Sequence, residues 1–521
     1  MDRRAENLGY FFSETAARMP EKAALIDLLG GERRRTYRDL DARCDAVAAL
    51  AAAQGLAPGD RAALALGNRI EFVEIFFGLM RAGVVPVPLN VRQAPATLSF
   101  MMEDSGCRAA FVDQNAAADA IGVAEALSLP GRIVIGAAKG WIELESALAS
   151  VAGRRPEPAI SPDGIAFQPY TAGSTGRPKG VRLTHRGMLW SIRTTQERWP
   201  ISDTEVGLVA VPLFHKNAMR GTIKPTLYAG GTAVIMPRFE PLAFIEALAT
   251  HGVTFSGGVP ALFSMLLQHR AAIEARSYPA LQSFSLGSAV VPPELIAEIE
   301  RAFPGVAVKE SYGLTEGGGP LRAPTDGRKI PRGSAGIAAD GYEVKLVDPD
   351  TGIEGRRGEL WTRSPCVTDG YHNRPDLTRE RIVDGWLRTG DVFMVDDDGF
   401  YFFFGRTDDM FSCGGENIYP KEVENLVMSH PAVRDAYCTS VPHHVKGLAP
   451  GVIVVPKSGA SVTPDEIRRY ALEHGPAYAH PRIVVLAEAL PPVGRRQGRS
   501  PARPCVARVG YPGKRLSPTA R

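Results

Sequence analysis

The sequence has no run of apolar residues long enough to cross a membrane, which takes about 20. Its first residues, Met-Asp-Arg-Arg-Ala-Glu-Asn, contain no apolar stretch of the kind that a signal peptide needs. The six cysteines are scattered and form no CxxC pair, so neither a zinc site nor a disulfide framework is indicated. We therefore expect a cytoplasmic protein in a reducing compartment.

An excess of charge of one sign is also missing. The net charge is +3 over 521 residues, too small to favour nucleic acid or an anionic membrane as a partner. The length is sufficient for two or more domains around a large core, and the composition is typical of a soluble globular enzyme. The sequence does not decide the oligomeric state, so a homo-oligomer stays open.

Residues 170–185 form the most informative stretch, which reads Tyr-Thr-Ala-Gly-Ser-Thr-Gly-Arg-Pro-Lys-Gly-Val-Arg-Leu-Thr-His. Its glycines allow the backbone to curl around an anion, its hydroxyls can donate hydrogen bonds, and Lys179 adds a cation. The apolar run Ile165–Phe167 before it and the alternating residues Val181 and Leu183 after it predict two strands. The stretch is therefore predicted to be a hairpin turn that grips phosphate.

Two other interpretations of this stretch compete with the hairpin. A phosphate loop of the Walker type needs a helix directly after its lysine, whereas Pro178 and Gly180 flank Lys179 and strand-like alternation follows. A surface loop that is merely rich in turn residues is the second alternative. The rest of the chain has to decide between the hairpin and that loop.

Helical patterns alternate with short apolar strands, as in α/β proteins with a mostly parallel sheet. Helices are predicted at residues 37–54, 70–82 and 241–251, and a smaller unit from Lys421 has helices at 421–429 and 464–474. The predicted strands are residues 62–66, 84–89, 109–112, 132–135, 207–211, 232–236, 253–257, 433–441 and 450–456. We expect an α/β fold, with a large N-terminal domain of layered α/β sheets plus a small mobile α+β C-terminal domain.

Polar residues follow several of the predicted strands, where α/β sheets usually bind ligands. His215 lies in such a loop, and we assign it a lining role because a lone histidine is more often structural than catalytic. A later strand is predicted to deliver Tyr312 to a glycine-flanked turn, with Thr315 and Glu316 just beyond. A carboxylate beside a hydroxyl suits Mg²⁺, and an exposed aromatic residue before a glycine suits the stacking of a base.

Two more charged residues are candidates for nucleotide binding. Asp391, predicted at the end of a strand, could accept hydrogen bonds from a ribose diol, and Arg406 could donate to the same sugar or to a phosphate. The acidic pair at residues 408–409, followed by the glycine pair at 414–415, indicates a domain boundary.

Five runs in a fixed order match one family: residues 170–185, 312–316, 386–391, 406–408 and 414–420. On these runs the chain resembles the adenylate-forming superfamily, and most closely its AMP-forming acyl-CoA synthetases, up to Pro492. The resemblance implies that a carboxylic acid attacks the α-phosphate of ATP, giving an acyl-adenylate and pyrophosphate. The thiol of coenzyme A then displaces AMP. ATP, Mg²⁺ and coenzyme A are the implied cofactors.

The resemblance also implies the domain organisation and the site. It gives an N-terminal domain of residues 1–406, a rotating C-terminal lid of residues 407–494 with its hinge near Asp408, and an atypical basic tail of residues 495–521. The implied catalytic residues are Lys179, Thr315, Glu316 and Asp408, with Glu316 as the ligand of Mg²⁺. The implied nucleotide-binding residues are Thr171, Gly173, Ser174, Thr175, Gly176, Lys179, Ser288, Ala289, Glu310, Ser311, Tyr312, Gly313, Thr315, Asp391, Arg406, Gly414 and Gly415.

The acyl pocket implied by the resemblance lies in three segments. Its residues are His215, Lys216, Asn217, Met219, Gly258, Val259 and Gly287. Small residues there, including Gly257 and Ser288, leave room for a ring or a chain, and the acid itself stays undetermined. Lys216 and Arg220 could meet a second polar group, and a second carboxylate bound by Arg220 is our hypothesis.

The C-terminal tail departs from the family. The family ends with Leu-Pro-x-x-x-x-Gly-Lys, whose lysine bridges the carboxylate and the α-phosphate. Here Leu490-Pro-Pro-Val-Gly is followed by Arg-Arg-Gln-Gly-Arg-Ser, with no lysine in register. Residues 495–521 hold seven arginines and Lys514 but no acid, and they are too rich in proline and glycine for the expected last helix.

A shifted reading frame would explain this tail. If residues 495–500 were encoded CGC CGG CAA GGT CGA TCG, loss of the first base would give Ala-Gly-Lys-Val-Asp in place. The alternative is a genuine basic tail with another use. If the tail is genuine, adenylation should be badly slowed, because one positioned charge in the transition state is worth orders of magnitude.

Two rival functions stay open on the sequence. One is a stand-alone adenylating enzyme that loads a carrier protein, although no fused carrier domain is visible. The other is a nucleotide or acyl-adenylate binding protein with impaired adenylation, which the absent lysine favours. The leading hypothesis is an ATP-dependent carboxylate:CoA ligase.

Overall fold

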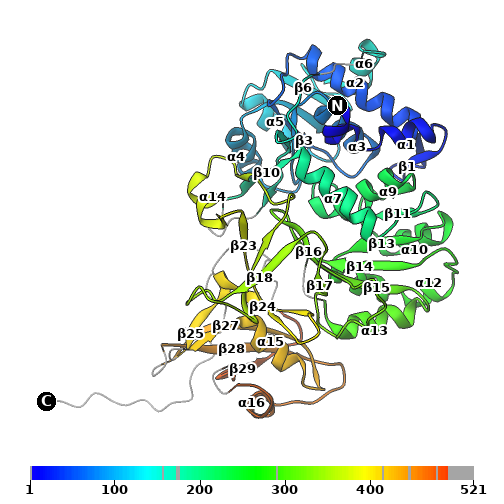
Figure 1. Ribbon diagram of the computed structural model, residues 1–521. Coiled ribbons are helices and arrows are strands. Elements are labelled where there is room, and N and C mark those ends of the chain that lie inside the picture. The colour runs from blue at the N-terminus through cyan, green and yellow to red at the C-terminus, as the bar shows by residue number, and fades with distance from the viewer. Residues whose placement is uncertain are drawn as a thin grey trace. The chain divides into compact units, whose positions relative to one another are not determined.

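The computed structural model describes residues 3–154, 158–171, 177–288, 291–413, 416–443, 447–476 and 479–490 (Figure 1). The chain divides into two compact units, and the second begins at Met410. Within the described ranges no helix is long and apolar enough to cross a membrane.

A nine-stranded sheet forms the largest layer of the first unit, in the order β17-β16-β15-β14-β13-β11-β12-β1-β2 (Figure 1). The six strands from β1 across to β15 run parallel, whereas β2 at one edge and β16 and β17 at the other edge pair antiparallel, so the predicted mostly parallel sheet is confirmed. Their bounds are Ala23–Asp27 (β1), Arg33–Thr36 (β2), Val206–Val209 (β11), Thr232–Ile235 (β12), Phe255–Gly258 (β13), Ser283–Gly287 (β14), Ala307–Leu314 (β15), Gly318–Arg322 (β16) and Ile337–Ala338 (β17).

Three helices bury an aromatic core against this sheet. They are α10 (Pro241–Thr250), α11 (Pro260–Leu267) and α13 (Pro293–Ala302). Phe263 and Phe303 each pack edge-on against Phe284 of β14, with ring centroids 5.1 Å apart in both pairs. This packing holds β14 against the helices, and two candidate residues, Gly287 and Ser288, lie at the carboxyl end of that strand.

A second sheet, entirely parallel, has the order β4-β3-β5-β6-β7. Its strands are Arg61–Ala65 (β3), Val85–Pro88 (β4), Cys107–Asp113 (β5), Gly131–Ile135 (β6) and Ile142–Glu143 (β7). Helix α2 (Tyr37–Ala53) begins after Thr36, whose hydroxyl caps the helix by accepting from the Asp39 amide. Helix α3 (Ile70–Arg81) is buried along its whole length. The helices predicted at 37–54 and 70–82 are therefore confirmed to within one residue.

The phosphate-loop stretch is a hairpin, as the sequence predicts. Strand β10 (Lys179–Thr184) pairs antiparallel with β8 (Ile165–Phe167) and with the short β9 (Tyr170–Thr171). Strand β21 (Gly370–Tyr371) pairs with the other side of β10. Since Lys179 lies directly across from Thr171, the loop brings its first hydroxyl and its lysine to one place.

An antiparallel sheet, β19-β18-β20-β23-β22 with β24 beside β23, completes the first unit. Its strands are Glu343–Val347 (β18), Glu354–Gly355 (β19), Arg357–Arg363 (β20), Ile382–Val383 (β22), Trp386–Val395 (β23) and Tyr401–Arg406 (β24). The expectation that Asp391 ends a strand is wrong, because β20 and β24 both pair with β23 and extend it to Val395. Tyr312 likewise lies inside β15, which continues to Leu314 by pairing with β16.

The second unit holds a three-stranded sheet of β27 (Val433–His443), β28 (Gly447–Pro456) and β29 (Ile483–Leu486). Helices α15 (Pro420–Met428) and α16 (Pro464–His474) bury Val423, Val427 and Ile467 in its core. The short strands β25 (Phe411–Cys413) and β26 (Glu416–Ile418) precede them. The small α+β domain that the sequence predicts is confirmed.

The remaining helices of the first unit connect these layers. They are α1 (Ser13–Arg18), α4 (Pro95–Ser105), α5 (Ala118–Ala126), α6 (Leu144–Ser150), α7 (His185–Arg198), α8 (Lys216–Ala218), α9 (Lys224–Ala229), α12 (Arg270–Glu274) and α14 (Pro375–Arg381). A π-helical turn at Met219–Ile223 joins α8 to α9. Residues 216–229 are therefore helical throughout.

Candidate active site

Several residues predicted for the site lie outside the described residues. They are Gly173, Ser174, Thr175 and Gly176 of the loop, Ala289 of the pocket, and Gly414 and Gly415 after the proposed hinge. Their roles stay predictions. The described candidates all belong to the first unit, and the structure gives their contacts.

Glu316 is the centre of the first group of contacts. Its Oε1 accepts hydrogen bonds from the Thr171 hydroxyl at 3.4 Å and from the Tyr371 hydroxyl at 3.2 Å. The ammonium of Lys179 lies 4.8 Å from the centre of the Tyr371 ring. Strands β9, β10 and β21 and the turn after β15 thus bring one carboxylate, two hydroxyls and one cation together.

Charged neighbours surround the Lys179 ammonium. Burial lowers the pKa of Lys179, while the nearby Glu316 carboxylate raises it and the Arg381 guanidinium lowers it. Arg381 in turn donates a hydrogen bond to the Thr389 carbonyl at 2.8 Å, and its Nε has no acceptor among the described residues. Lys179 and Arg381 carry two positive charges against the single negative charge of Glu316. The surroundings of Lys179 therefore have an excess of positive charge, which favours the binding of phosphate.

A second group of contacts is a chain of polar side chains across β15, β23 and β24. The Tyr312 hydroxyl donates to Oδ2 of Asp391 at 2.5 Å, and Arg406 donates to Oδ1 at 2.8 Å. Arg406 also forms an ion pair with Asp408 at 3.7 Å. The register that places Asp391 directly opposite Arg406 produces this arrangement.

Burial dominates the electrostatics of this chain of contacts. Burial raises the pKa of Asp391, and the Arg406 cation and the Tyr312 hydroxyl oppose that shift. Burial also raises the pKa of Tyr312, and Asp391 raises it further, so the phenol stays protonated and donates. The ring of Tyr312 packs edge-on against Phe393 at 4.9 Å, so it is only partly accessible and not fully exposed as the sequence suggests.

The ends of β14 and β15 lie side by side, with Gly287 opposite Ser311 and Leu286 opposite Glu310. A Cβ on Gly287 would lie 2.8 Å from the Ser311 carbonyl oxygen, so close approach of the strands itself requires the glycine. Burial raises the pKa of Glu310 to about 7. The close packing of β14 and β15 therefore requires a glycine at position 287, and its role in leaving room for the acid stays a prediction.

Ser288 has a left-handed backbone with φ of 62°, which is strained for a residue other than glycine. Its hydroxyl accepts a hydrogen bond from the Asn217 amide at 3.2 Å. That bond joins two of the predicted pocket segments. His215, directly before α8, packs its ring against Phe214 with centroids 4.3 Å apart.

Other predicted pocket residues have different surroundings. The Lys216 side chain is buried and donates to the Thr315 carbonyl at 2.6 Å. Met219 is buried as well, and Val259 is partly buried. A Cβ on Gly258 would lie 3.2 Å from Leu262, so that glycine too is close to its neighbours.

Sequence reasoning missed Tyr371 and Arg381. Tyr371 ends β21, and Arg381 ends α14, and both were passed over because neither belongs to a run of motif residues. A possible signal was the Gly370-Tyr371 pair, whose glycine has φ of 125° and so marks a special turn. For Arg381 the sequence offered no signal that separates it from Arg379.

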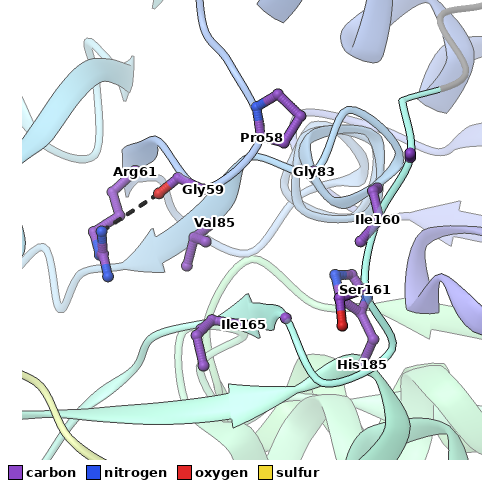
Figure 2. A pocket seen from close by; sticks show the side chains of 11 residues that line it. Pro58, Gly59, Arg61, Gly83, Val85, Ile160, Ser161, Ile165 and His185 are labelled. Atoms are coloured by element: carbon purple, nitrogen blue, oxygen red, sulfur yellow. Dashed lines mark hydrogen bonds between the residues drawn. The ribbon is translucent and has the colours of Figure 1, made fainter.

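The pocket in Figure 2 is distinct from these groups. It has a volume of about 190 Å³ and is lined by residues such as Pro58, Val85, Ile165 and His185. Arg61 donates to the Gly59 carbonyl beside it, at 3.4 Å. None of the predicted site residues lines it, so it carries no part of the chemistry considered below.

The oxygen atoms around Glu316 fit a magnesium ion. Mg²⁺ prefers oxygen ligands and is usually held by one or two carboxylates together with phosphates and waters. Among the described residues no cluster of three or more histidine, cysteine or acidic side chains could hold a metal ion. The single carboxylate with two neighbouring hydroxyls fits a magnesium ion shared with phosphate.

Comparison with protein families decides the relationship. A family model described as AMP-binding enzyme matches residues 12–372, and one described as AMP-binding enzyme C-terminal domain matches residues 422–495. The chain belongs to the AMP-binding enzyme family. The family therefore covers both compact units, and residues 496–521 lie outside the match.

Relatives of this AMP-binding enzyme include CoA ligases of different substrates. It is similar to a feruloyl-CoA synthase of Amycolatopsis sp, 32% identical over 464 residues, covering 88% of this chain and 91% of that protein. It is also similar to a long-chain-fatty-acid–CoA ligase of Mycobacterium tuberculosis, 31% identical over 499 residues, covering 94% and 97%. Its fold matches the crystal structure of ATP-bound MatB from Rhodopseudomonas palustris with a TM-score of 0.83 at 27% identity, covering 93% and 95%.

The AMP-binding enzyme described here is an acid–thiol ligase. It activates a carboxylic acid with ATP to an acyl-adenylate and transfers the acyl group to coenzyme A, giving acyl-CoA, AMP and pyrophosphate. It uses ATP, Mg²⁺ and coenzyme A.

Proposed function

We propose that the two groups of contacts form one nucleotide site, in which Lys179, Thr171 and Glu316 face the phosphates and Asp391 and Arg406 face the ribose. The observation that carries this assignment is the convergence of Lys179 and Glu316 from β10 and the turn after β15. Arg381 supports it, because its charge lowers the pKa of both Lys179 and Asp391 and so acts on both groups. Thr315 lies beside the α-phosphate in this proposal.

In the adenylation step a carboxylate oxygen of the acid forms a bond to the α-phosphorus, and the bond from that phosphorus to the bridging oxygen of pyrophosphate breaks. Charge grows on the phosphate oxygens during this exchange. Lys179 and Arg381 stabilise that charge from fixed positions. Glu316 would hold Mg²⁺, which would supply further neutralisation of the phosphate charge.

In the thioester step the sulfur of coenzyme A attacks the acyl carbon, and the carbon–oxygen bond to AMP breaks. We propose that residues 407–494 form a lid that rotates about Asp408 between the two steps. Asp408 suits a hinge because it lies one residue before the boundary of the first unit and its ion pair with Arg406 can open. A lid also keeps the reactive acyl-adenylate from water.

Residues 495–521 bear on the rate of adenylation. We propose that the present chain adenylates slowly, since no lysine follows Gly494 in register. The absent lysine favours the alternative of a binding protein with impaired adenylation.

An enzyme that loads a carrier protein is the other alternative, and the similarity to CoA ligases weighs against it. We also propose a cytoplasmic location, because five cysteines among the described residues are free and buried.

Isotope exchange between pyrophosphate and ATP tests the function. We expect exchange that depends on one class of carboxylic acid, followed by thioester formation when coenzyme A is added. A panel of butyrate, hexanoate and benzoate with their matched diacids succinate, adipate and terephthalate samples the main classes. Exchange without thioester formation would support the carrier-protein alternative, and ATP binding without exchange on any acid would support the binding-protein alternative.

Asp391→Asn is expected to raise the KM for ATP about 10- to 100-fold, the effect of losing a hydrogen bond to a charged group. The change removes the charge that Arg406 and the ribose share. Tyr312→Phe is the matched control, because it removes the other hydrogen bond to the same carboxylate and keeps the charge. An Asp391→Asn enzyme with the parent KM for ATP would remove Asp391 from the ribose site.

A further inference from the structure

Three cations project from one helical stretch next to the proposed adenylation site. Lys216, Arg220 and Lys224 follow one another at intervals of four residues along 216–229, so they share one face of the helix. Arg220 lies on the π-helical turn, a rare feature that is frequent at functional sites. Lys216 and Arg220 both lower the pKa of Lys224, as expected when the three charges lie close together.

These cations have almost no partners. Lys224 is 2% exposed and Lys216 is 7% exposed. Of the three, only Lys216 makes a hydrogen bond within the described residues, to the Thr315 carbonyl. Arg220 and Lys224 pair with no carboxylate in the described ranges, and the Nε of Arg220 is buried without an acceptor.

The surroundings of the cluster are neutral. The guanidinium of Arg220 lies against the β15–β16 hairpin so closely that a Cβ on Gly319 would be 1.8 Å from its Nη2. The ammonium of Lys224 lies 6.0 Å from the ring centre of Phe167. The other groups that act on the cluster are the Cys366 thiol, the Tyr342 phenol and the Glu316 carboxylate, of which Glu316 reaches Lys216 alone.

Buried cations without counter-ions cost folding free energy, because each loses its hydration and gains no ion pair. Burial lowers the pKa of Lys224 to about 7 and that of Lys216 to about 8, which records this cost. A chain can keep such a cluster when a ligand supplies the negative charge. The proposed function assigns Lys179 and Arg381 to the phosphates of ATP, which leaves the acid as the substrate that can supply the counter-ion of this cluster.

We propose that the acid activated by this enzyme carries a second anionic group, in the simplest case a second carboxylate, and that Arg220 and Lys224 bind it. This inference rests on the proposed function, because it places Lys216, Arg220 and Lys224 at the end of the acyl pocket that is farther from the nucleotide. Asn217 and Ser288 stand at the near end, and their hydrogen bond joins the α8 segment to β14. Arg220 can grip a carboxylate with two parallel N–H donors, and Lys224 adds a point charge.

The test compares the matched acids in the full-length chain. For the parent protein, we expect kcat/KM in pyrophosphate exchange to be about 10- to 100-fold higher for a diacid than for its monoacid, the worth of a hydrogen bond to a charged group. Arg220→Met and Lys224→Met should each lower the diacid-to-monoacid ratio at least about 10-fold, by the same loss. Lys345→Met is the matched control, since Lys345 lies over Trp361 and Trp386 and away from the cluster.

Calorimetry of the diacid alone supplies a readout without turnover, in which the parent binds and Arg220→Met binds at least about 10-fold more weakly. Arg220→Lys, which keeps the charge, should restore part of the preference and shows that the site is folded. Exchange that favours the monoacids in the parent would overturn this inference while leaving the proposed function standing. A higher KM for ATP in Arg220→Met, with the acid preference unchanged, would also overturn it, because the cluster would then serve the nucleotide. No exchange with any acid would instead contradict the proposed function.

Discussion

A chain in which residues 495–499 read Ala-Gly-Lys-Val-Asp should form acyl-adenylate about 10²- to 10³-fold faster than the present chain, the worth of one positioned charge in a transition state. The replacement restores the family ending after Leu490-Pro491, with the lysine at position 497. That lysine would meet the carboxylate and the α-phosphate together, whereas the proposed function assigns Lys179 to the leaving phosphates. Pyrophosphate exchange at saturating ATP and acid measures the change.

The same replacement with methionine in place of the lysine is the control, because it matches the length and lacks the charge. It should stay as slow as the present chain. Thioester formation from added acyl-adenylate should be similar in all three proteins, since that step needs no such lysine. Equal exchange rates in the lysine and methionine versions would contradict the proposal that adenylation is slow because the lysine charge at position 497 is missing.

The origin of the tail can be tested separately. Sequencing the DNA that encodes residues 495–500 shows whether loss of one base gives Gly-Lys in the next frame, and the mass of the intact protein shows which tail is made. Codons that cannot give Gly-Lys in another frame would rule out a frameshift. The match of the C-terminal family model, which ends at residue 495, is what a frameshift at this place predicts.

Glu316→Gln is expected to lower the adenylation rate about 10²-fold or more and to raise the Mg²⁺ concentration needed for half the maximal rate. The hydroxyls of Thr171 and Tyr371 both donate hydrogen bonds to Oε1 of the Glu316 carboxylate. The amide keeps hydrogen-bonding capacity but loses the charge that a magnesium ion needs. A titration with Mg²⁺ measures the effect, and an unchanged Mg²⁺ requirement would remove Glu316 from the metal site.

The same variant should shift the pH profile. Glu316 raises the pKa of Lys179, and burial lowers it, so loss of the carboxylate charge lowers that pKa further. The protonated form of Lys179 is present below its pKa, and the decline of activity at alkaline pH should therefore begin at a lower pH in Glu316→Gln. Tyr371→Phe is the matched control, because it removes one hydrogen bond and leaves the charge, so its alkaline limb should stay in place.

Local pattern was sufficient for the hairpin that carries Lys179. Apolar residues at 165–167 and the alternation of Val181 and Leu183 flank a run of glycines and hydroxyls, and this pattern predicts the two strands and the turn between them. The pairing of Lys179 with Thr171 was not predicted, because it depends on the additional short strand β9. The layers of the fold followed from the same periodicity, as the agreement at α2 and α3 illustrates. Asp391 and Tyr312 were found as candidates but misplaced at strand ends, because sheet partners far along the chain decide where a strand stops.

Contacts that depend on tertiary packing could not be predicted from the sequence. Tyr371 and Arg381 meet Glu316 and Lys179 only because β21 pairs with β10 and α14 follows it. The sequence also could not predict where the Lys216 side chain points. Helical spacing alone does not tell whether a side chain enters the pocket or packs against a neighbouring strand or turn. Its contact with the Thr315 carbonyl became visible only with the packing of 216–229 against the β15–β16 turn.

This enzyme joins the carboxylate of its acid to the α-phosphate of ATP, and the fate of the carboxylate oxygen tests this step most directly. The acid is labelled with ¹⁸O in its carboxylate and incubated with ATP, Mg²⁺ and coenzyme A, and the phosphate products are analysed by mass spectrometry. We expect one labelled oxygen in AMP and none in pyrophosphate, because the carboxylate oxygen bonded to the α-phosphorus leaves with AMP. Label in inorganic phosphate, together with ADP, would contradict it.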